Sequence, residues 1–402
     1  MFKEMLTVMS EQSAQALAER VSFRALWYKE WADLFLKAYA PDATVVYTSL
    51  YAFPMEILAA FDVAPFDFEI AGGSLISSTE WGVPTMCAAE NRGFSRDLCS
   101  FHRAGLGGYY LNYFPRPHLI ITTSHYCDGK AKANDILGSL YGIEPQFLYV
   151  PATINKDSIG YVEHQLRAIA ARIGEVAGHA LDEDRLKEAV RSSNRARRSQ
   201  MQILELLKHA PNPWDGQMQC GYAINGQLFA GSPTMERLHE VLLQELQARI
   251  HTGKLRPEKH RLYWFAWLPT YPSNLFEILK EHQVGVSLCE TFRVFGDEID
   301  EDHPFEGLAL KCLTNPFVGA TDRRIAGLEN LKEEYRLDGA LLFATPCCRQ
   351  SKSAYRLLKE KVNGIGMPFA ILDMDIADPR GYSPEQTRMR LESFIELLDA
   401  RT

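Results

Sequence analysis

The chain has 402 residues, 46% of them hydrophobic and 23% charged, and its formal net charge is −8. This length exceeds what a single hydrophobic core usually serves, so two or three α/β lobes are expected. No apolar run reaches the roughly 18–20 residues that span a membrane, and no basic stripe suggests a nucleic-acid partner. The N-terminal residues lack the apolar core of a signal peptide, which predicts a cytoplasmic protein.

The first part of the chain alternates between helical and strand patterns. Residues 1–40 are amphipathic and predict a helical segment, and a helix is expected to begin at Pro54. Three short apolar or β-branched runs predict buried strands: 44–48, 119–123 and 147–150. A helix is expected between the last two strands. Strand, helix and strand in this order indicate a parallel sheet.

The second part repeats this alternation after a long helical stretch. Residues 161–209 are helical and rich in charge, and a break follows at 210–214. Four further strands are predicted: 261–267, 285–289, 339–344 and 369–373. Helices are predicted over 272–283, 351–361 and 383–400. We therefore predict an α/β protein with two doubly wound parallel-sheet lobes, divided as follows: helical segment 1–40, first lobe 41–165, helical connection 166–255 and second lobe 256–402.

Cysteines lie where ligands bind in such sheets. A reducing cytoplasm disfavours disulfides, so its cysteines are metal ligands, nucleophiles or core residues. Ligands bind beyond the carboxyl ends of parallel strands. Four cysteines follow or end predicted strands: Cys127, Cys289, Cys347 and Cys348. Cys99 precedes a glycine-rich stretch, and Cys220 and Cys312 are expected in the core. No C-x-x-C or other compact motif is present, so the residues alone leave metal site, nucleophile and core open.

Five segments in chain order carry a family pattern. They are a P-x-E-hydrophobic helix at 54–65, a G-x-S-x-x-x-C segment at 93–100, a C-D pair at 127–128 leading to V-P at 150–151, a D-G pair at 338–339 followed by a strand and cysteine, and an ending at 367–396 similar to R-x-x-A-F-x-E. Together they resemble the 2-hydroxyacyl-CoA dehydratase / benzoyl-CoA reductase family over nearly the whole chain. The last segment departs from the pattern, with Met389 where the family favours threonine.

The resemblance implies two flavodoxin-like lobes with a [4Fe–4S] cluster between them. Its cysteine ligands would be Cys99, Cys127 and Cys348, because counting from the D-G pair reaches Cys348 rather than Cys347. The fourth iron position would stay open to water, a sulfur species or substrate. Glu56 matches the family's P-x-E glutamate and would be a proton-handling or iron-facing catalytic carboxylate. Asp128 is expected to cap the following helix.

The resemblance also implies partners and a reaction. Family subunits pair as homo- or heterodimers and receive electrons from an ATP-hydrolysing iron–sulfur activator protein, and this chain has no P-loop of its own. One electron on the thioester carbonyl of an acyl-CoA gives a ketyl radical that expels the 2-hydroxyl group; a related class of subunits reduces an aromatic ring.

Three alternatives remain at this point. The further thiols of Cys87, Cys289, Cys312 and Cys347 suggest an [8Fe–9S] double-cubane cluster that reduces small molecules. A second alternative is a non-catalytic, cluster-carrying partner subunit. A zinc enzyme is the third, because thiolates also suit zinc.

Overall fold

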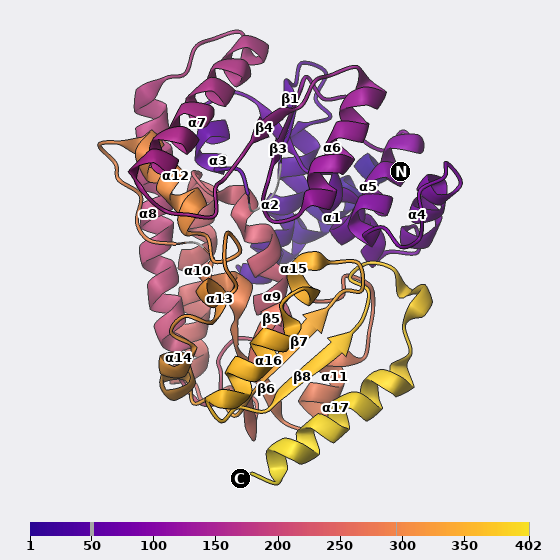
Figure 1. Ribbon diagram of the computed structural model, residues 1–402, viewed down its shortest axis with the longest axis vertical. Coiled ribbons are helices and arrows are strands. Elements are labelled where there is room, and N and C mark those ends of the chain that lie inside the picture. The colour runs from indigo at the N-terminus through magenta and orange to yellow at the C-terminus, as the bar shows by residue number, and fades with distance from the viewer. Residues whose placement is uncertain (49–51, 295, 402) are drawn as a thin grey trace.

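The computed structural model describes residues 1–48, 52–294 and 296–401, and two parallel sheets of four strands form its centre (Figure 1). The first sheet has the order β2-β1-β3-β4. Its strands are β1 (Val45–Tyr47), β2 (Ala64–Phe66), β3 (Leu119–Thr123) and β4 (Gln146–Leu148). The second has the order β6-β5-β7-β8. Its strands are β5 (His260–Ala266), β6 (Val284–Cys289), β7 (Gly339–Ala344) and β8 (Phe369–Asp373).

The two lobes share one topology. Counted within each lobe, both sheets have the strand order 2-1-3-4, which is the flavodoxin-like doubly wound arrangement. Every residue of β3, β5 and β7 is buried, because helices cover both faces of a parallel sheet. The predicted fold class is confirmed.

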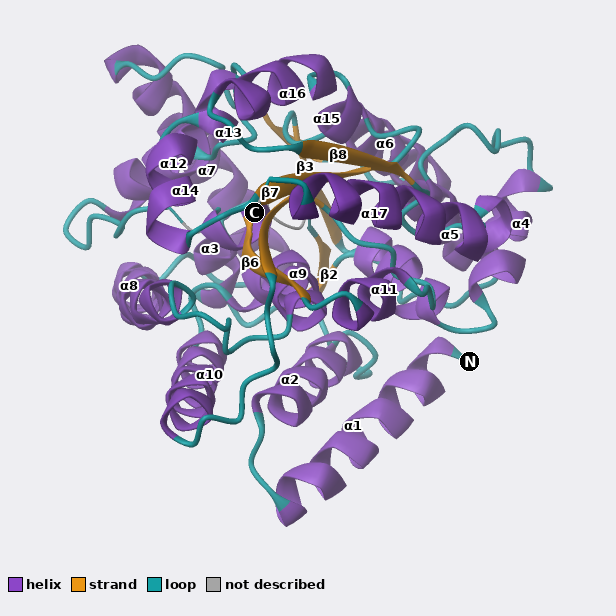
Figure 2. Cartoon of the chain, turned by 90° about the horizontal axis from the view of Figure 1, so that it is seen from below, coloured by secondary structure: helices purple, strands orange, loops and turns teal. Residues whose placement is uncertain are grey.

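The first lobe begins with two helices rather than one. Its helices are α1 (Phe2–Glu19), α2 (Phe23–Lys37), α3 (Met55–Ala59), α4 (Gly82–Glu90), α5 (Ser100–Tyr110) and α6 (Asp128–Tyr141). The predicted segment 1–40 is interrupted before Ser22, whose hydroxyl caps α2 by accepting from the Ala25 amide. α1 packs against α2 on the outside of the lobe (Figure 2).

Four helices connect the sheets, and three of them, α7, α8 and α10, lie along one flank of the molecule (Figure 1). They are α7 (Lys156–Ala177), α8 (Glu183–Leu206), α9 (Gly216–Asn225) and α10 (Pro233–His251). α8 and α10 pack side by side. The predicted helical stretch 161–209 thus forms two helices, and Asp182 caps the second of them.

The second lobe contains seven helices among the described residues. They are α11 (Leu275–Glu281), α12 (Pro304–Thr314), α13 (Asp322–Ile325), α14 (Leu328–Tyr335), α15 (Arg349–Lys352), α16 (Tyr355–Gly364) and α17 (Pro384–Asp399). α15 and α16 cover one face of the sheet, and α9 and α11 cover the other (Figure 2).

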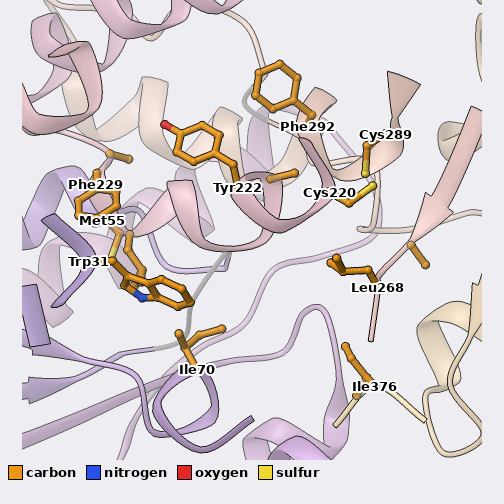
Figure 3. Close-up of a cluster of buried hydrophobic side chains, with 14 of the residues drawn as sticks. Trp31, Met55, Ile70, Cys220, Tyr222, Phe229, Leu268, Cys289, Phe292 and Ile376 are labelled. Atoms are coloured by element: carbon orange, nitrogen blue, oxygen red, sulfur yellow. The ribbon is translucent and has the colours of Figure 1, made fainter. Parts of the chain in front are cut away.

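Buried apolar side chains from both lobes form one contiguous cluster. Figure 3 shows part of it, with Trp31, Met55 and Ile70 of the first lobe near Leu268 and Ile376 of the second. The lobes therefore pack against each other through their cores. None of the helices in the described ranges combines the length and apolar character required to cross a lipid bilayer.

Candidate functional site

The two sheets present cysteines at equivalent positions. β3 and β7 are the third strands of their lobes, and each lies beside the first strand, where the strand order reverses. Cys127 lies four residues beyond Thr123, the end of β3, and Cys348 lies four residues beyond Ala344, the end of β7. Each cysteine immediately precedes a helix, α6 or α15. This crevice is the usual ligand site of open parallel sheets.

Cys99 reaches the same region from the helix that leads into β3. It immediately precedes α5. Glycines let α5 lie very close to its neighbours: a Cβ atom on Gly107 would be 1.8 Å from the Thr85 carbonyl oxygen of α4, and one on Gly105 would be 2.3 Å from the Phe68 ring. This close packing fixes the position of the N-terminus of α5, and with it Cys99.

The side chains of Cys99, Cys127 and Cys348 line a single cavity of about 100 Å³. Much of the remaining wall is aromatic or aliphatic, formed by Ile70, Phe101, Tyr126, Trp267 and Ile376. The wall includes residues of both lobes, so the cavity lies between them. A larger hollow of about 430 Å³ opens beside Trp214 and Lys280, near the start of β6, and no cysteine lines it.

A buried network of charged groups forms another part of the wall. The Lys130 ammonium lies 2.8 Å from Glu69 Oε2 and 3.1 Å from Asp67 Oδ2. His102 Nε2 lies 2.6 Å from Glu69 Oε1. Asp67 Oδ1 also accepts the backbone amides of Glu69 and Ile70. Glu69, His102 and Lys130 line the cavity with the cysteines.

These contacts keep Glu69 and Lys130 ionised. Burial alone would raise the pKa of Glu69, but Lys130 and His102 outweigh it and lower that pKa to about 2. Burial likewise opposes the charge on Lys130, yet Asp67 and Glu69 raise the pKa of this ammonium above its ordinary value. The cavity wall therefore carries fixed charges of both signs.

The surroundings of Cys99 and Cys127 favour the protonated thiol. Burial raises the pKa of Cys127 to about 11, against the opposing effect of the Lys130 and Gly129 amides. The Cys99 thiol donates a hydrogen bond to the Cys347 sulfur, and this bond together with burial raises the pKa of Cys99. Because metal ions bind thiolates, a metal centre here would displace these protons.

Cys347 and Cys348 face different surroundings. Cys348 lines the cavity. The Cys347 sulfur instead accepts the hydrogen bond from Cys99, which lowers the pKa of Cys347. Cys348 also occupies the position of the second lobe that Cys127 occupies in the first. The placement favours Cys348, although its assignment as a ligand stays a prediction.

The cavity suits a cluster better than a single ion. Among the residues that the structure describes, no three His, Cys, Asp or Glu side chains are close enough to share one metal ion. The cysteines of an iron–sulfur cluster bind different iron atoms, so they surround a space rather than a point. The Thr345 hydroxyl, buried at the cavity wall, has no hydrogen-bond partner in the described part of the chain and could donate to a sulfide. These residues fit a [4Fe–4S] cluster.

Glu56 is not on the wall of this cavity. It lies fully buried in the first turn of α3, where Oε1 accepts from the Lys311 ammonium at 2.5 Å and from the Ser193 hydroxyl at 2.7 Å. Burial would raise the pKa of Glu56, but Lys311 and Ser193 lower it. Lys311 lines a separate small cavity together with His125. The structure thus does not bring Glu56 into the wall that the three cysteines share, and its catalytic role stays a prediction.

The other cysteines do not line the cavity. Cys220 of α9 and Cys289 of β6 are buried and hydrogen-bonded to each other in the core (Figure 3). Cys312 is buried on α12. Cys87 on α4 lies 3.6 Å from an Arg380 nitrogen. The core placement predicted for Cys220 and Cys312 is confirmed.

The prediction that Asp128 caps a helix is wrong. Cys127 occupies the cap position of α6, and Asp128 is the first helical residue. Its carboxylate pairs with Arg349, which follows Cys348 in the other lobe. The two residues that directly follow the cavity cysteines thus bind each other across the lobes.

The sequence reasoning missed Glu69, His102 and Lys130. A usable signal exists for two of them: His102 is three residues after Cys99, and Lys130 is three residues after Cys127. In the first turn of a helix this spacing places a side chain beside the preceding cap residue. Glu69 follows β2, a strand that was not predicted.

Comparisons with known proteins agree with this architecture. The family model described as "2-hydroxyglutaryl-CoA dehydratase, D-component" matches residues 50–398. The chain is 25% identical to one of the subunits of benzoyl-CoA reductase of Thauera aromatica, over 78% of this chain and 79% of that one. It is 22% identical to the alpha subunit of (R)-2-hydroxyisocaproyl-CoA dehydratase of Clostridioides difficile, over 95% and 96%.

A further relative is the alpha subunit of (R)-2-hydroxyglutaryl-CoA dehydratase of Acidaminococcus fermentans, 22% identical over 71% of this chain and 61% of that one. The relatives are named as subunits of dehydratases and of a reductase that act on CoA thioesters. The family match covers every strand of the two sheets except β1, and all three cavity cysteines. With its paired flavodoxin-like lobes, the chain belongs to the 2-hydroxyglutaryl-CoA dehydratase D-component family of enzymes.

Proposed function

We propose that the chain is an iron–sulfur catalytic subunit that passes low-potential electrons to an acyl-CoA thioester, either to dehydrate a 2-hydroxyacyl group or to reduce an aromatic ring. A [4Fe–4S] cluster would be held by Cys99, Cys127 and Cys348. The observation that carries the proposal is that these three cysteines, each placed at the start of a helix, line one interlobe cavity. The names of the relatives support the substrate class.

The chain's own residues would bind and shield the reacting centre. When bound, the cluster supplies a low-potential electron and an open iron position for Lewis-acid chemistry. Ile70, Trp267 and Ile376 form apolar wall that excludes water. The Tyr126 ring completes this wall, and Asn315 fixes its hydroxyl by donating a hydrogen bond of 2.7 Å. An apolar surround strengthens electrostatic interactions inside the cavity.

The proposal includes two protein partners. The relatives are named as single subunits of larger enzymes, which supports pairing of this chain with a homologous subunit as a homo- or heterodimer. An ATP-hydrolysing iron–sulfur activator would deliver the electrons, since the sequence contains no P-loop. A cytoplasmic location and the absence of nucleic-acid and membrane partners stay predictions.

The test is anaerobic purification followed by iron and sulfide analysis. We expect about four irons and four sulfides per chain. The same protein, supplied with activator and ATP, is then titrated with a panel of 2-hydroxyacyl- and arylacyl-CoA thioesters. We expect the electron paramagnetic resonance spectrum of the reduced centre to change with at least one thioester, and that thioester to be converted.

Other outcomes would contradict the proposal in distinct ways. About eight irons per chain would indicate the double-cubane alternative, although Cys87 and Cys289, which such a cluster could use, do not line the cavity. Stoichiometric zinc in a colourless protein would indicate a zinc site. A cluster that reduces but responds to no thioester would indicate a non-catalytic partner subunit.

A further inference from the structure

The charged network beside the cavity is almost completely buried, and its groups are paired with one another. We call Asp67, Glu69, His102 and Lys130 the charged wall. Each of these four residues is at most 8% exposed, and Asp67 is 0% exposed. Ionised groups are rarely buried in this way unless they are paired. Here each charge has a partner, and three of the four residues line the cysteine cavity.

The charged wall contains more carboxylates than ammonium groups. Lys130 alone faces both Asp67 and Glu69. Two carboxylates thus share this one ammonium, and Glu69 has the His102 imidazole as its second partner. Glu69 and Lys130 line the same cavity as the three cysteines, so their charges act on a centre that the cysteines hold. Apolar surroundings screen such fields only weakly.

We propose that Lys130 and Glu69 act as positioning residues that set the reduction potential of the metal centre with opposite signs. Reduction adds one negative charge to the centre, so the Lys130 ammonium favours it and the Glu69 carboxylate opposes it. The Glu69 carboxylate thereby favours the low potential that electron transfer to a thioester requires. This inference rests on the function proposed above, because it presupposes a cluster in the cavity.

The test is a redox titration of the anaerobic, cluster-loaded chain. It compares the wild-type protein with Lys130→Gln, Glu69→Gln and the double variant. Lys132→Gln is the matched control, because Lys132 lies on the same helix, is 80% exposed and does not line the cavity. The potential is read from the electron paramagnetic resonance signal, which needs neither activator nor substrate. All variants are repeated with His102→Gln, so that a change in imidazole protonation cannot mask a charge effect.

The two single variants are expected to move in opposite directions. Lys130→Gln should lower the equilibrium constant for reduction roughly tenfold, which is about 59 mV for a one-electron couple. Glu69→Gln should raise it by a similar factor. The double variant should return close to the wild-type value, and Lys132→Gln should not differ from it. A purely structural role would give shifts of one sign or none.

Each failure has its own signature. If the wild-type chain binds no iron, both the function and this inference are wrong. If the cluster is present but both variants leave its potential unchanged, or shift it in the same direction, only the inference is wrong. Circular dichroism and iron content check each variant for folding and loading. If Lys130→Gln fails either check, the shift in Glu69→Gln decides. A potential that falls, or that does not change, overturns the inference.

Discussion

At the scale of single residues, the cavity cysteines share one local setting. Cys99, Cys127 and Cys348 each directly precede a helix. The first amides of a helix lack intrahelical partners and carry partial positive charge, which stabilises a thiolate. At Cys127 burial acts in the opposite direction and prevails, since it raises the pKa of this thiol to about 11. A metal therefore has to supply the remaining stabilisation.

Substituting the cavity cysteines should remove the cluster. We expect serine at position 99, 127 or 348 to lose most of the bound iron, because a hydroxyl is a poor ligand for iron–sulfur clusters. Cys347→Ser is the comparison variant: Cys347 neighbours Cys348 and accepts a hydrogen bond from Cys99 but does not line the cavity, so the variant should keep its iron. Anaerobic iron and sulfide analysis measures the difference. Loss of iron in Cys347→Ser but not in Cys348→Ser would reverse the assignment.

The sequence predicts these cysteines but not their charged neighbours, for a physical reason. Cys127 and Cys348 follow strands whose continuous apolar runs are plain in the sequence, and the carboxyl-end rule then places them. The pairing of Lys130 with Glu69 joins two segments that are 61 residues apart in the sequence. No local pattern encodes such a contact, because it depends on how the sheet orders its strands.

At the scale of elements, β2 explains why Asp67 and Glu69 of the charged wall were not predicted from the sequence. The strand has three residues, Ala64–Phe66, and includes Pro65. Proline disrupts strand patterns but is tolerated at a sheet edge, and β2 is one of the two edge strands of the first sheet. Asp67 and Glu69 follow its carboxyl end, where ligand sites form. Unless the strand is recognised, no pattern in the sequence places these two carboxylates near Cys127.

The packing of α5 yields a prediction of its own. Gly107→Ala places a methyl group against the Thr85 carbonyl oxygen, only 1.8 Å away. Overpacking of this kind should cost about 2 kcal/mol of unfolding free energy, and displacement of α5 should also lower iron retention through Cys99. Chemical denaturation and iron analysis measure both effects.

Gly160→Ala is the control for this change. Gly160 also lies within a helix, α7, and nothing stands within 4 Å of a Cβ atom there. Alanine is the better helix former, so the substitution should raise stability by up to about 1 kcal/mol. Equal destabilisation of the two variants would show that close approach of α5 to α4 is not required.

At the scale of the whole molecule, a group of ion pairs joins the two lobes. Arg103 of α5 donates to Asp378 of the second lobe at 3.0 Å, and Arg380 of the second lobe lies 2.5 Å from Glu90 of α4. Arg103 is 1% exposed and also donates from Nε to the Leu98 carbonyl, next to Cys99. Because both lobes supply cavity cysteines, these ion pairs couple the docking of the lobes to the geometry of the site.

The Asp378 carboxylate should make this docking sensitive to acid. Burial would raise the pKa of Asp378, but Arg380 and Arg103 outweigh it and lower that pKa from 3.8 to about 2. A carboxyl with a lowered folded-state pKa stabilises the folded protein above its unfolded-state pKa, and this contribution is lost as the pH falls through the folded value. Asp378→Asn should therefore be less stable than wild type at pH 7, by about 2 kcal/mol for a charged hydrogen bond. The difference should shrink between about pH 4 and pH 2, where wild-type Asp378 takes up a proton. Urea denaturation across this range measures the difference in stability.

Asp135→Asn is the control, since its pair with Lys132 is exposed and should contribute little at any pH. A stability difference that stays constant from pH 7 to pH 2 would show that the Asp378 charge does not hold the lobes together.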